Sequence, residues 1–204
     1  MLWGFVAVTA PLVLSPGPST AVVLRNSIGA GVRGGVFTSL GANSGSACYG
    51  LVVAFGFAAA LQRWPSVWLL LRWGGVVYLT WLGMQSLRRA VRGRAAMAAP
   101  PADGSRGGWQ SFASGWMTNV LNPSLGAFYL IVLPQFIPRE APFASAVLTL
   151  TAVHAAMAFS WHLAWVLAGA TLARVLSRRG PRQVLDVLTG VALLALAVEV
   201  LLRA

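Results

Sequence analysis

The sequence predicts an all-α integral membrane protein, and three observations support this fold class. First, 57% of the 204 residues are hydrophobic and only 9% are charged. Second, several apolar runs reach about 18 residues, a length at which a helix can cross a bilayer. Third, prolines interrupt two of these runs in a similar way, as in the broken helices of transporters. We therefore expect little of the chain to lie outside the membrane.

Six membrane-spanning helices can be drawn along the chain, which we treat as one transmembrane domain over residues 1–204. We interpret the first apolar run as mature structure rather than a signal peptide. No positive residue precedes it, and no small-residue cleavage site follows it. The predicted spans are Leu2–Leu24, Val36–Leu61, Val67–Leu87, Ser111–Ile137, Phe143–Leu172 and Val184–Leu202.

Proline clusters predict that the first and fourth helices are broken. Pro16-Gly17-Pro18 lies inside the first span, and Asn122-Pro123 lies inside the fourth. Each proline lacks an N–H, and its ring clashes with the preceding turn, so these spans cannot be unbroken helices. Backbone groups freed at membrane depth must be buried in protein or line a cavity. A simple kink would explain one proline, whereas the paired clusters favour a substrate site.

The two halves of the chain are predicted to be inverted repeats. Residues 93–108 are rich in Ala, Pro and Gly, which indicates a flexible linker between repeat one (1–92) and repeat two (109–204). Gly17-Pro18-Ser19 corresponds to Asn122-Pro123-Ser124. With three spans in each half, the second copy enters the membrane from the opposite side. This arrangement recurs in transporters.

Glycines mark the faces on which the helices are expected to pack. Small residues let membrane helices approach closely, and such faces permit a homodimer without requiring one. Cys48 is the single cysteine, so no disulfide, redox pair or zinc cluster is available, and we expect no cofactor. The glycines of the second span are Gly41, Gly45, Gly50 and Gly56, and a short echo relates Gly75–Leu79 to Gly190–Leu194.

The charge distribution predicts the orientation in a bacterial-type inner membrane. The 15 basic residues are all arginine, and the net charge is +11. Eleven arginines fall in the odd-numbered loops and three on the other side, with Arg72 left out of the count. The positive-inside rule therefore places the odd loops in the cytoplasm and both termini outside. Nucleic-acid binding is not expected, because no folded basic domain collects these arginines.

The two breaks predict a binding site for a zwitterionic amino acid. Pro18 and Pro123 suit the first turn of a helix, so each would begin the second half of its span. Because these spans run in opposite directions, two helix N-termini would converge near the midplane, each with free N–H groups and a partial positive charge that suit a carboxylate. Hydroxyls come from Ser19, Thr20 and Ser124. Freed carbonyls, Asn43, Asn119 and Asn122 offer acceptors to the ammonium group. The predicted substrate-binding residues are Pro16, Gly17, Pro18, Ser19, Thr20, Asn43, Asn119, Asn122, Pro123 and Ser124.

Simpler roles are open for several of these polar residues. Interhelical hydrogen bonding explains Asn43 better than a substrate site does, whereas Asn119 and Asn122, which flank the second break, favour the site. His154 lies near the middle of span five and is the candidate for carrying a coupled proton, although a neutral histidine can also donate one structural hydrogen bond. His162, beside Trp161 and Trp165, is expected at the membrane interface. Arg72 is expected to extend its side chain outward to the interface.

With its broken-helix motifs Ser15-Pro16-Gly17-Pro18 and Asn122-Pro123, the chain resembles the LysE/RhtB superfamily of amino-acid exporters. The resemblance implies efflux of amino acids or close derivatives from the cytoplasm, driven by an ion gradient. Two positions depart from the family pattern: Ser19 stands where many members have Asn or Asp, and Ser124 where many have Lys. The matching residues are Ser15-Pro16-Gly17-Pro18, Gly41, Gly74-Gly75, Tyr78-Leu79, Leu82-Gly83, Phe112, Gly115, Asn119, Asn122-Pro123, Phe128 and Pro134-Gln135-Phe136.

A secondary transporter that exports amino acids, with a proton as the coupling ion, is therefore the predicted function. A membrane channel or a non-transporting membrane protein is the first alternative. A channel would need charge rings or ordered carbonyls along a pore, and intramembrane charge is sparse here. An intramembrane enzyme is the second alternative. It is disfavoured because no Gly-x-Ser-x-Gly or His-Glu-x-x-His motif occurs in a span.

Overall fold

The structure, a computed structural model, describes residues 2–57, 66–92, 107–138, 140–176 and 179–202. Within these ranges the chain forms helices and turns and no strand, which confirms the all-α class. The elements are α1 (Leu2–Leu14), α2 (Pro18–Leu51), the π-helix η1 (Val52–Phe57), α4 (Ser66–Arg92), α5 (Gly108–Val120), α6 (Pro123–Ala127), the π-helix η2 (Phe128–Val132), the 3₁₀-helix η3 (Leu133–Phe136), α7 (Phe143–Leu176) and α8 (Arg179–Leu202).

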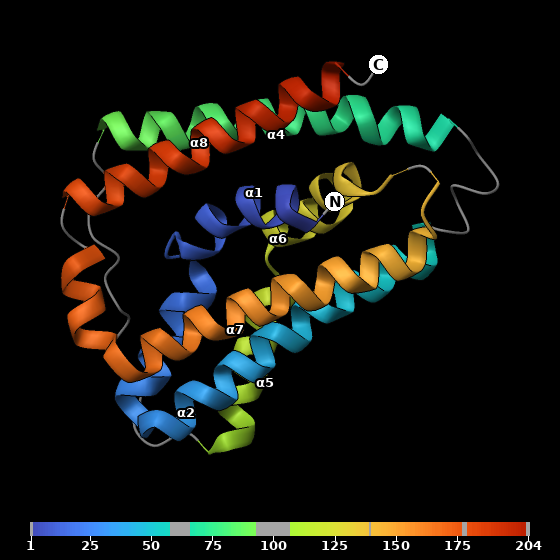
Figure 1. Ribbon diagram of the computed structural model, residues 1–204. Helices are drawn as coiled ribbons and strands as arrows, with labels where there is room; N and C mark the ends of the chain where they lie inside the picture. Colours follow the sequence, from blue (N-terminus) through green and yellow to red (C-terminus); the bar gives the residue numbers. More distant parts are fainter. Residues whose placement is uncertain (1, 58–65, 93–106, 139, 177–178, 203–204) are drawn as a thin grey trace.

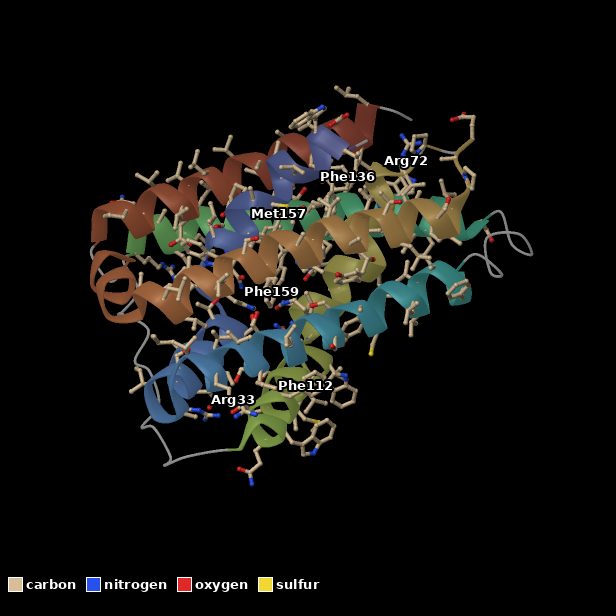
Figure 2. All side chains as sticks on the ribbon, turned by 60° about the horizontal axis from the view of Figure 1, so that its bottom comes forward. Arg33, Arg72, Phe112, Phe136, Met157 and Phe159 are labelled. Atoms are coloured by element: carbon tan, nitrogen blue, oxygen red, sulfur yellow. The ribbon has the colours of Figure 1, made fainter. Side chains whose placement is uncertain are left out.

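The helices form two layers with shorter elements between them (Figure 1). α4 and α8 lie side by side in one layer, while α2, α5 and α7 make up the other. α1 and α6 lie between the layers. The beginning of α1 and the end of α8 lie at the same end of the molecule (Figure 1). Arg33 and Arg72 lie toward opposite ends (Figure 2).

Four candidate membrane spans can be recognised among the described helices. Phe143–Ala168 and Gln183–Leu202 are each long and apolar enough to cross a bilayer alone. Two bent pairs reach that length and apolarity together. In the first, α1 and the stretch Pro18–Gly56 meet at an angle of 51°, and in the second, α5 and the stretch Pro123–Phe136 meet at 57°. α4 has 27 residues, about 40 Å at the usual rise per residue.

Both bent pairs change direction just before a proline. α1 ends at Leu14 and α2 begins at Pro18, while α5 ends at Val120 and α6 begins at Pro123. Each proline therefore occupies the first turn of a new helix, where its missing N–H would have had no partner. The preference of proline for the first turn of a helix thus explains why α2 and α6 begin at these residues.

The predicted loop between the first two spans is wrong. No separate loop divides these spans: α2 runs from Pro18 to Leu51 and turns only at Ala30 and Gly31. Gly31 has φ of +67°, a conformation that costs glycine little, so two residues suffice where the sequence suggested about ten. The last helix begins at Arg179, and its candidate membrane span, Gln183–Leu202, agrees with the predicted Val184–Leu202. The predicted linker 93–108 lies outside the described residues except for its last two.

A glycine seam joins α5 to α2. Side chains added at Gly41 and Gly115 would collide with the backbone of the other helix, at Phe112 and Thr38 respectively. Gly45 lies against Trp116 in the same way, with 3.0 Å between the added Cβ and the carbonyl oxygen. The predicted packing role is confirmed here and at Gly50, which lies against Thr151. At Gly56 an added Cβ would meet none of the described residues within 4 Å, so a packing role there stays a prediction.

A second seam joins α4 and α8, and it is nearly symmetric. An added Cβ at Gly83 would lie 2.8 Å from Leu194, and one at Gly190 would lie 2.7 Å from Leu87. Each glycine therefore receives the leucine that follows the other glycine by one helical turn. Close backbone approach at small residues is the usual means of packing between membrane helices.

Polar contacts fasten both ends of the α4–α8 pair. At one end, Ser86 Oγ donates to the carbonyl of Asp186 at 2.9 Å, and Arg89 Nε lies 3.9 Å from the Asp186 carboxylate. At the other end, Arg72 Nη2 donates to the carbonyl of Leu201 at 3.2 Å. Arg72 therefore binds a carbonyl in the last turn of α8 with its cationic group, where the helix dipole is negative.

The α2–α5 seam predicts a destabilised Gly41→Ala protein. The methyl group would force apart two backbones, and overpacking of this kind costs about 1–3 kcal/mol. Gly74→Ala is the matched control, since nothing lies within 4 Å of an added Cβ there. Chemical unfolding in detergent should show a lower midpoint for Gly41→Ala and not for Gly74→Ala. Equal midpoints would contradict the seam.

Candidate functional site

The first break leaves the N-terminus of a half-helix without a side-chain cap. Gly17, the N-cap of α2, has extended backbone (φ −115°, ψ −171°), and no side chain caps the first turn. An added Cβ at Gly17 would meet nothing within 4 Å, so open space adjoins the break. Pro18 is exposed, Pro16 and Ser19 are half-buried, and Thr20 is buried. The terminus therefore offers N–H donors and the positive end of a helix dipole.

The second break is capped by its own side chain. Asn122 is the N-cap of α6, and its Oδ1 accepts a hydrogen bond from the backbone N–H of Ser124 at 3.0 Å. This is the common capping arrangement for asparagine. The oxygen that the sequence analysis offers to an ammonium group is thus already engaged. Pro123 and Ser124 are exposed beside it.

Two other asparagines present acceptors that nothing in the described structure binds. Asn119 is 6% exposed, and its Nδ2 donates across the seam to the carbonyl of Ala42 at 2.8 Å and to Ser46 Oγ at 3.0 Å. Asn43 Nδ2 donates to the carbonyl of Ser39 at 2.8 Å within α2. Among the described residues, neither Asn43 Oδ1 nor Asn119 Oδ1 has a hydrogen-bond partner, although both atoms are buried. An unpaired buried acceptor is costly, so a donor is expected there.

Both histidines of α7 are buried, and each meets a hydroxyl group. The hydroxyl of Tyr129, in η2, lies 2.9 Å from Nδ1 of His154. Phe128 also covers this histidine, with 5.3 Å between ring centroids. His162 Nδ1 lies 3.2 Å from Ser39 Oγ of α2. His162, 4% exposed, is therefore buried between helices, and its expected depth near the membrane interface stays a prediction.

α2 and α7 pack side by side, and polar residues follow the seam between them. Three contacts share one antiparallel register, so Asn43 faces the part of α7 between the two histidines. The contacting pairs are Gly35 with Val166, Ser39 with His162, and Gly50 with Thr151. The predicted residues Asn43 and His154 are thus brought to the same seam.

Sequence reasoning missed several members of this polar region. Tyr129 and Ser39 bind the histidines, and Asn26 donates to both Thr38 Oγ1 and Ser114 Oγ at 2.8 Å across the turn at Gly31. One signal was available. Ser39, Asn43 and Ser46 recur at the spacing of one helix face, which marks a polar stripe in an apolar helix. Nothing comparable pointed to Tyr129.

A cavity of about 580 Å³ lies apart from these polar residues. It is lined by the beginning of α1, the end of η3 with Pro138, and the last turns of α8. None of the predicted site residues lines it. This cavity and the candidate site are therefore distinct features of the structure.

Comparison with known proteins places the chain in a family. The model of the LysE type translocator family matches residues 10–204. The chain belongs to the LysE type translocator family. This confirms the resemblance drawn from the motifs and, with it, the membrane class of the fold. The comparison with solved structures gives no match.

Several known proteins are similar to this chain along much of its length. The leucine efflux protein of Salmonella typhimurium (strain LT2) is 31% identical over 142 residues, which cover 69% of this chain and 65% of that protein. That of Enterobacter sp. (strain 638) is 30% identical over 139 residues, covering 68% and 64%. The chain thus spans slightly less than two thirds of these leucine efflux proteins. The uncharacterized membrane protein YrhP of Bacillus subtilis (strain 168) is 23% identical over 167 residues, covering 79% and 80%.

The contacts of the two asparagines predict different effects on stability. Asn119→Ala removes interhelical hydrogen bonds, each worth about 0.6 kcal/mol in a membrane protein, and should lower the free energy of unfolding by about 1 kcal/mol. Asn43→Ala removes bonds within one helix and should change it less. Unfolding titrations in detergent compare the two. A larger loss for Asn43→Ala would contradict this assignment of contacts.

Proposed function

We propose that this chain is a secondary transporter that exports an aliphatic amino acid from the cytoplasm, with leucine as the first substrate to test. Membership of the translocator family and the likeness to proteins named for leucine efflux support the substrate class. The observation that carries the proposal is the pair of buried oxygens of Asn43 and Asn119, which have no partner among the described residues, in a chain with two bent helix pairs. An ammonium group supplies the donors that these oxygens lack.

The substrate carboxylate binds at the first break. The first turn of α2 has no side-chain cap and faces open space at Gly17, so its N–H groups are available to an anion. Ser19 and Thr20 add hydroxyl donors at the same terminus. The second break contributes the positive end of its helix through Pro123 and Ser124, but Asn122 already caps that terminus.

The ammonium group binds between Asn43 and Asn119. Each side chain is held by its Nδ2, which leaves the oxygen as the group to be satisfied. Two amide oxygens carry no formal charge. They therefore suit an ammonium group better than a metal ion, which prefers carboxylate ligands. From the sequence alone, helix packing was the favoured explanation of Asn43. In this proposal Asn43 is a substrate contact.

His154 carries the coupled proton. A charged imidazolium is costly inside a membrane protein unless a partner accepts from it, so protonation favours a conformation that provides one. The hydroxyl of Tyr129 at Nδ1 is a partner that can donate to a neutral imidazole and accept from a charged one. Proton binding and the rearrangement of η2 against α7 are coupled in this way.

Two inverted repeats of three spans supply the alternating access. α1 and α5 each have 13 residues, and each ends just before a proline-initiated half-helix. Pro123 follows Pro18 by 105 residues and Gly190 follows Gly83 by 107, so these pairs share nearly one offset. Gly83, which packs symmetrically on Gly190, is therefore a better counterpart than the Gly75 suggested by the sequence echo. Rocking of one repeat against the other then exposes the site to each side in turn.

The orientation and assembly follow from the same proposal. The arginine-rich ends lie in the cytoplasm and both termini lie outside an inner membrane, as the positive-inside rule predicts. Exposed apolar side chains along α4 and α8, such as Trp73, Val77 and Val191, contact lipid or a second copy in a homodimer.

Transport of labelled leucine tests the proposal directly. In proteoliposomes the wild-type protein should exchange leucine across the membrane and accumulate it against its gradient when a pH gradient is imposed. Asn43→Ala and Asn119→Ala should each reduce this exchange at least tenfold, because the ammonium group loses an acceptor. Ser44→Ala, next to Asn43 and bound only within its helix, is the control. Leucine flux without accumulation would instead indicate a channel.

The pH-gradient response separates His154 from His162. His154→Ala should retain leucine exchange but lose accumulation driven by the pH gradient, because no group binds the coupled proton. His162→Asn should keep accumulation within twofold, since that histidine meets Ser39 in helix packing. Accumulation by His154→Ala with unchanged pH dependence would remove this histidine from the mechanism.

A further inference from the structure

The cavity between α1, η3 and α8 has a composition that the proposed site does not explain. Its wall is made largely of small and apolar residues, with two polar side chains, Gln135 and Glu199. Small residues on facing helices normally let those helices touch. Here Gly4, Ala7 and Ala195 leave about 580 Å³ open, which is within the usual size range of small-molecule pockets.

The cavity has an apolar floor and a charged rim. Phe136 and Leu196 are buried at its base, and Phe136 is fixed there by an edge-to-face contact with Phe5 at 5.3 Å. Glu199 is exposed and brings the only acidic side chain among the lining residues. The hollow thus combines an aliphatic surface with a carboxylate near its mouth.

This combination selects a particular ligand chemistry. A carboxylate accepts hydrogen bonds and attracts a cation, and the Gln135 amide adds a further polar group. A negatively charged ligand would be repelled by Glu199. A primary ammonium group on a short aliphatic chain satisfies both parts of the wall, with its charge at Glu199 and its chain over Leu196.

We propose that this cavity is an outer vestibule that holds the ammonium end of the exported amino acid at Glu199 before release. The assignment to the outer side rests on the proposed function and orientation, in which the beginning of α1 and the end of α8 face outward. The vestibule is separate from the break and the asparagines, none of which lines it. An amino acid leaving the central site would therefore be drawn outward by a second, weaker contact.

Cysteine protection tests the vestibule without relying on transport. In a Cys48→Ser background, which removes the chain's single cysteine, Ala195→Cys places a thiol on the cavity wall. Ser66→Cys, the matched control, places one at the exposed first residue of α4, which is outside the lining and on the outer side in the proposed orientation. A membrane-impermeant maleimide added from outside should label both. The probe is isopentylamine, which has the leucine side chain and an ammonium group but no carboxylate.

Isopentylamine should slow labelling at position 195 at least fivefold and leave position 66 unchanged. Glu199→Gln should raise the concentration needed for protection at least tenfold, and Glu199→Asp should restore part of it. An unchanged labelling rate of the Gln protein without probe would show that the wall is intact. Equal protection by neutral isopentanol, or full protection in Glu199→Gln, would overturn the proposal and indicate an apolar hollow for lipid. Because the probe is not a transport substrate, loss of leucine exchange alone would count against the proposed function and not against the vestibule.

Discussion

The structure depends on the contact between the backbones of α5 and α2 at Gly41 and Gly115. Each glycine lies directly against a carbonyl of the other helix, so neither position tolerates a side chain. This contact holds α5 against α2 in the turns that precede the second break. It also brings Asn119 within hydrogen-bond reach of Ala42 and Ser46 on α2. A few close-packed glycines thereby position a polar side chain that the membrane would otherwise disfavour.

In the proposed inverted repeat, the two halves of the molecule are packed differently. α1 corresponds to α5 in that repeat. α1 borders an open cavity, whereas α5 is closely held. Such asymmetry between repeats is what a transporter open toward one side requires.

Polar groups in the apolar interior of this protein fall into two kinds: those with a structural partner and those without one among the described residues. Asn122 is engaged by its own helix end, and Arg72 binds a carbonyl of α8, so both have structural partners. The oxygens of Asn43 and Asn119 remain as buried acceptors without a partner among the described residues. In a medium without water, such groups indicate where a polar guest is accommodated.

The sequence by itself determined the all-α membrane class, the family and the prolines at which helices restart. These features depend on local chemistry: apolar length, and a residue without an N–H. Tertiary structure alone decided that His162 is buried against Ser39 and that Tyr129 meets His154. It also decided that a turn at Gly31 replaces the first loop and that a cavity lies beside α1. Those outcomes depend on which helix faces meet, and apolar helices of similar composition do not encode their neighbours in local sequence.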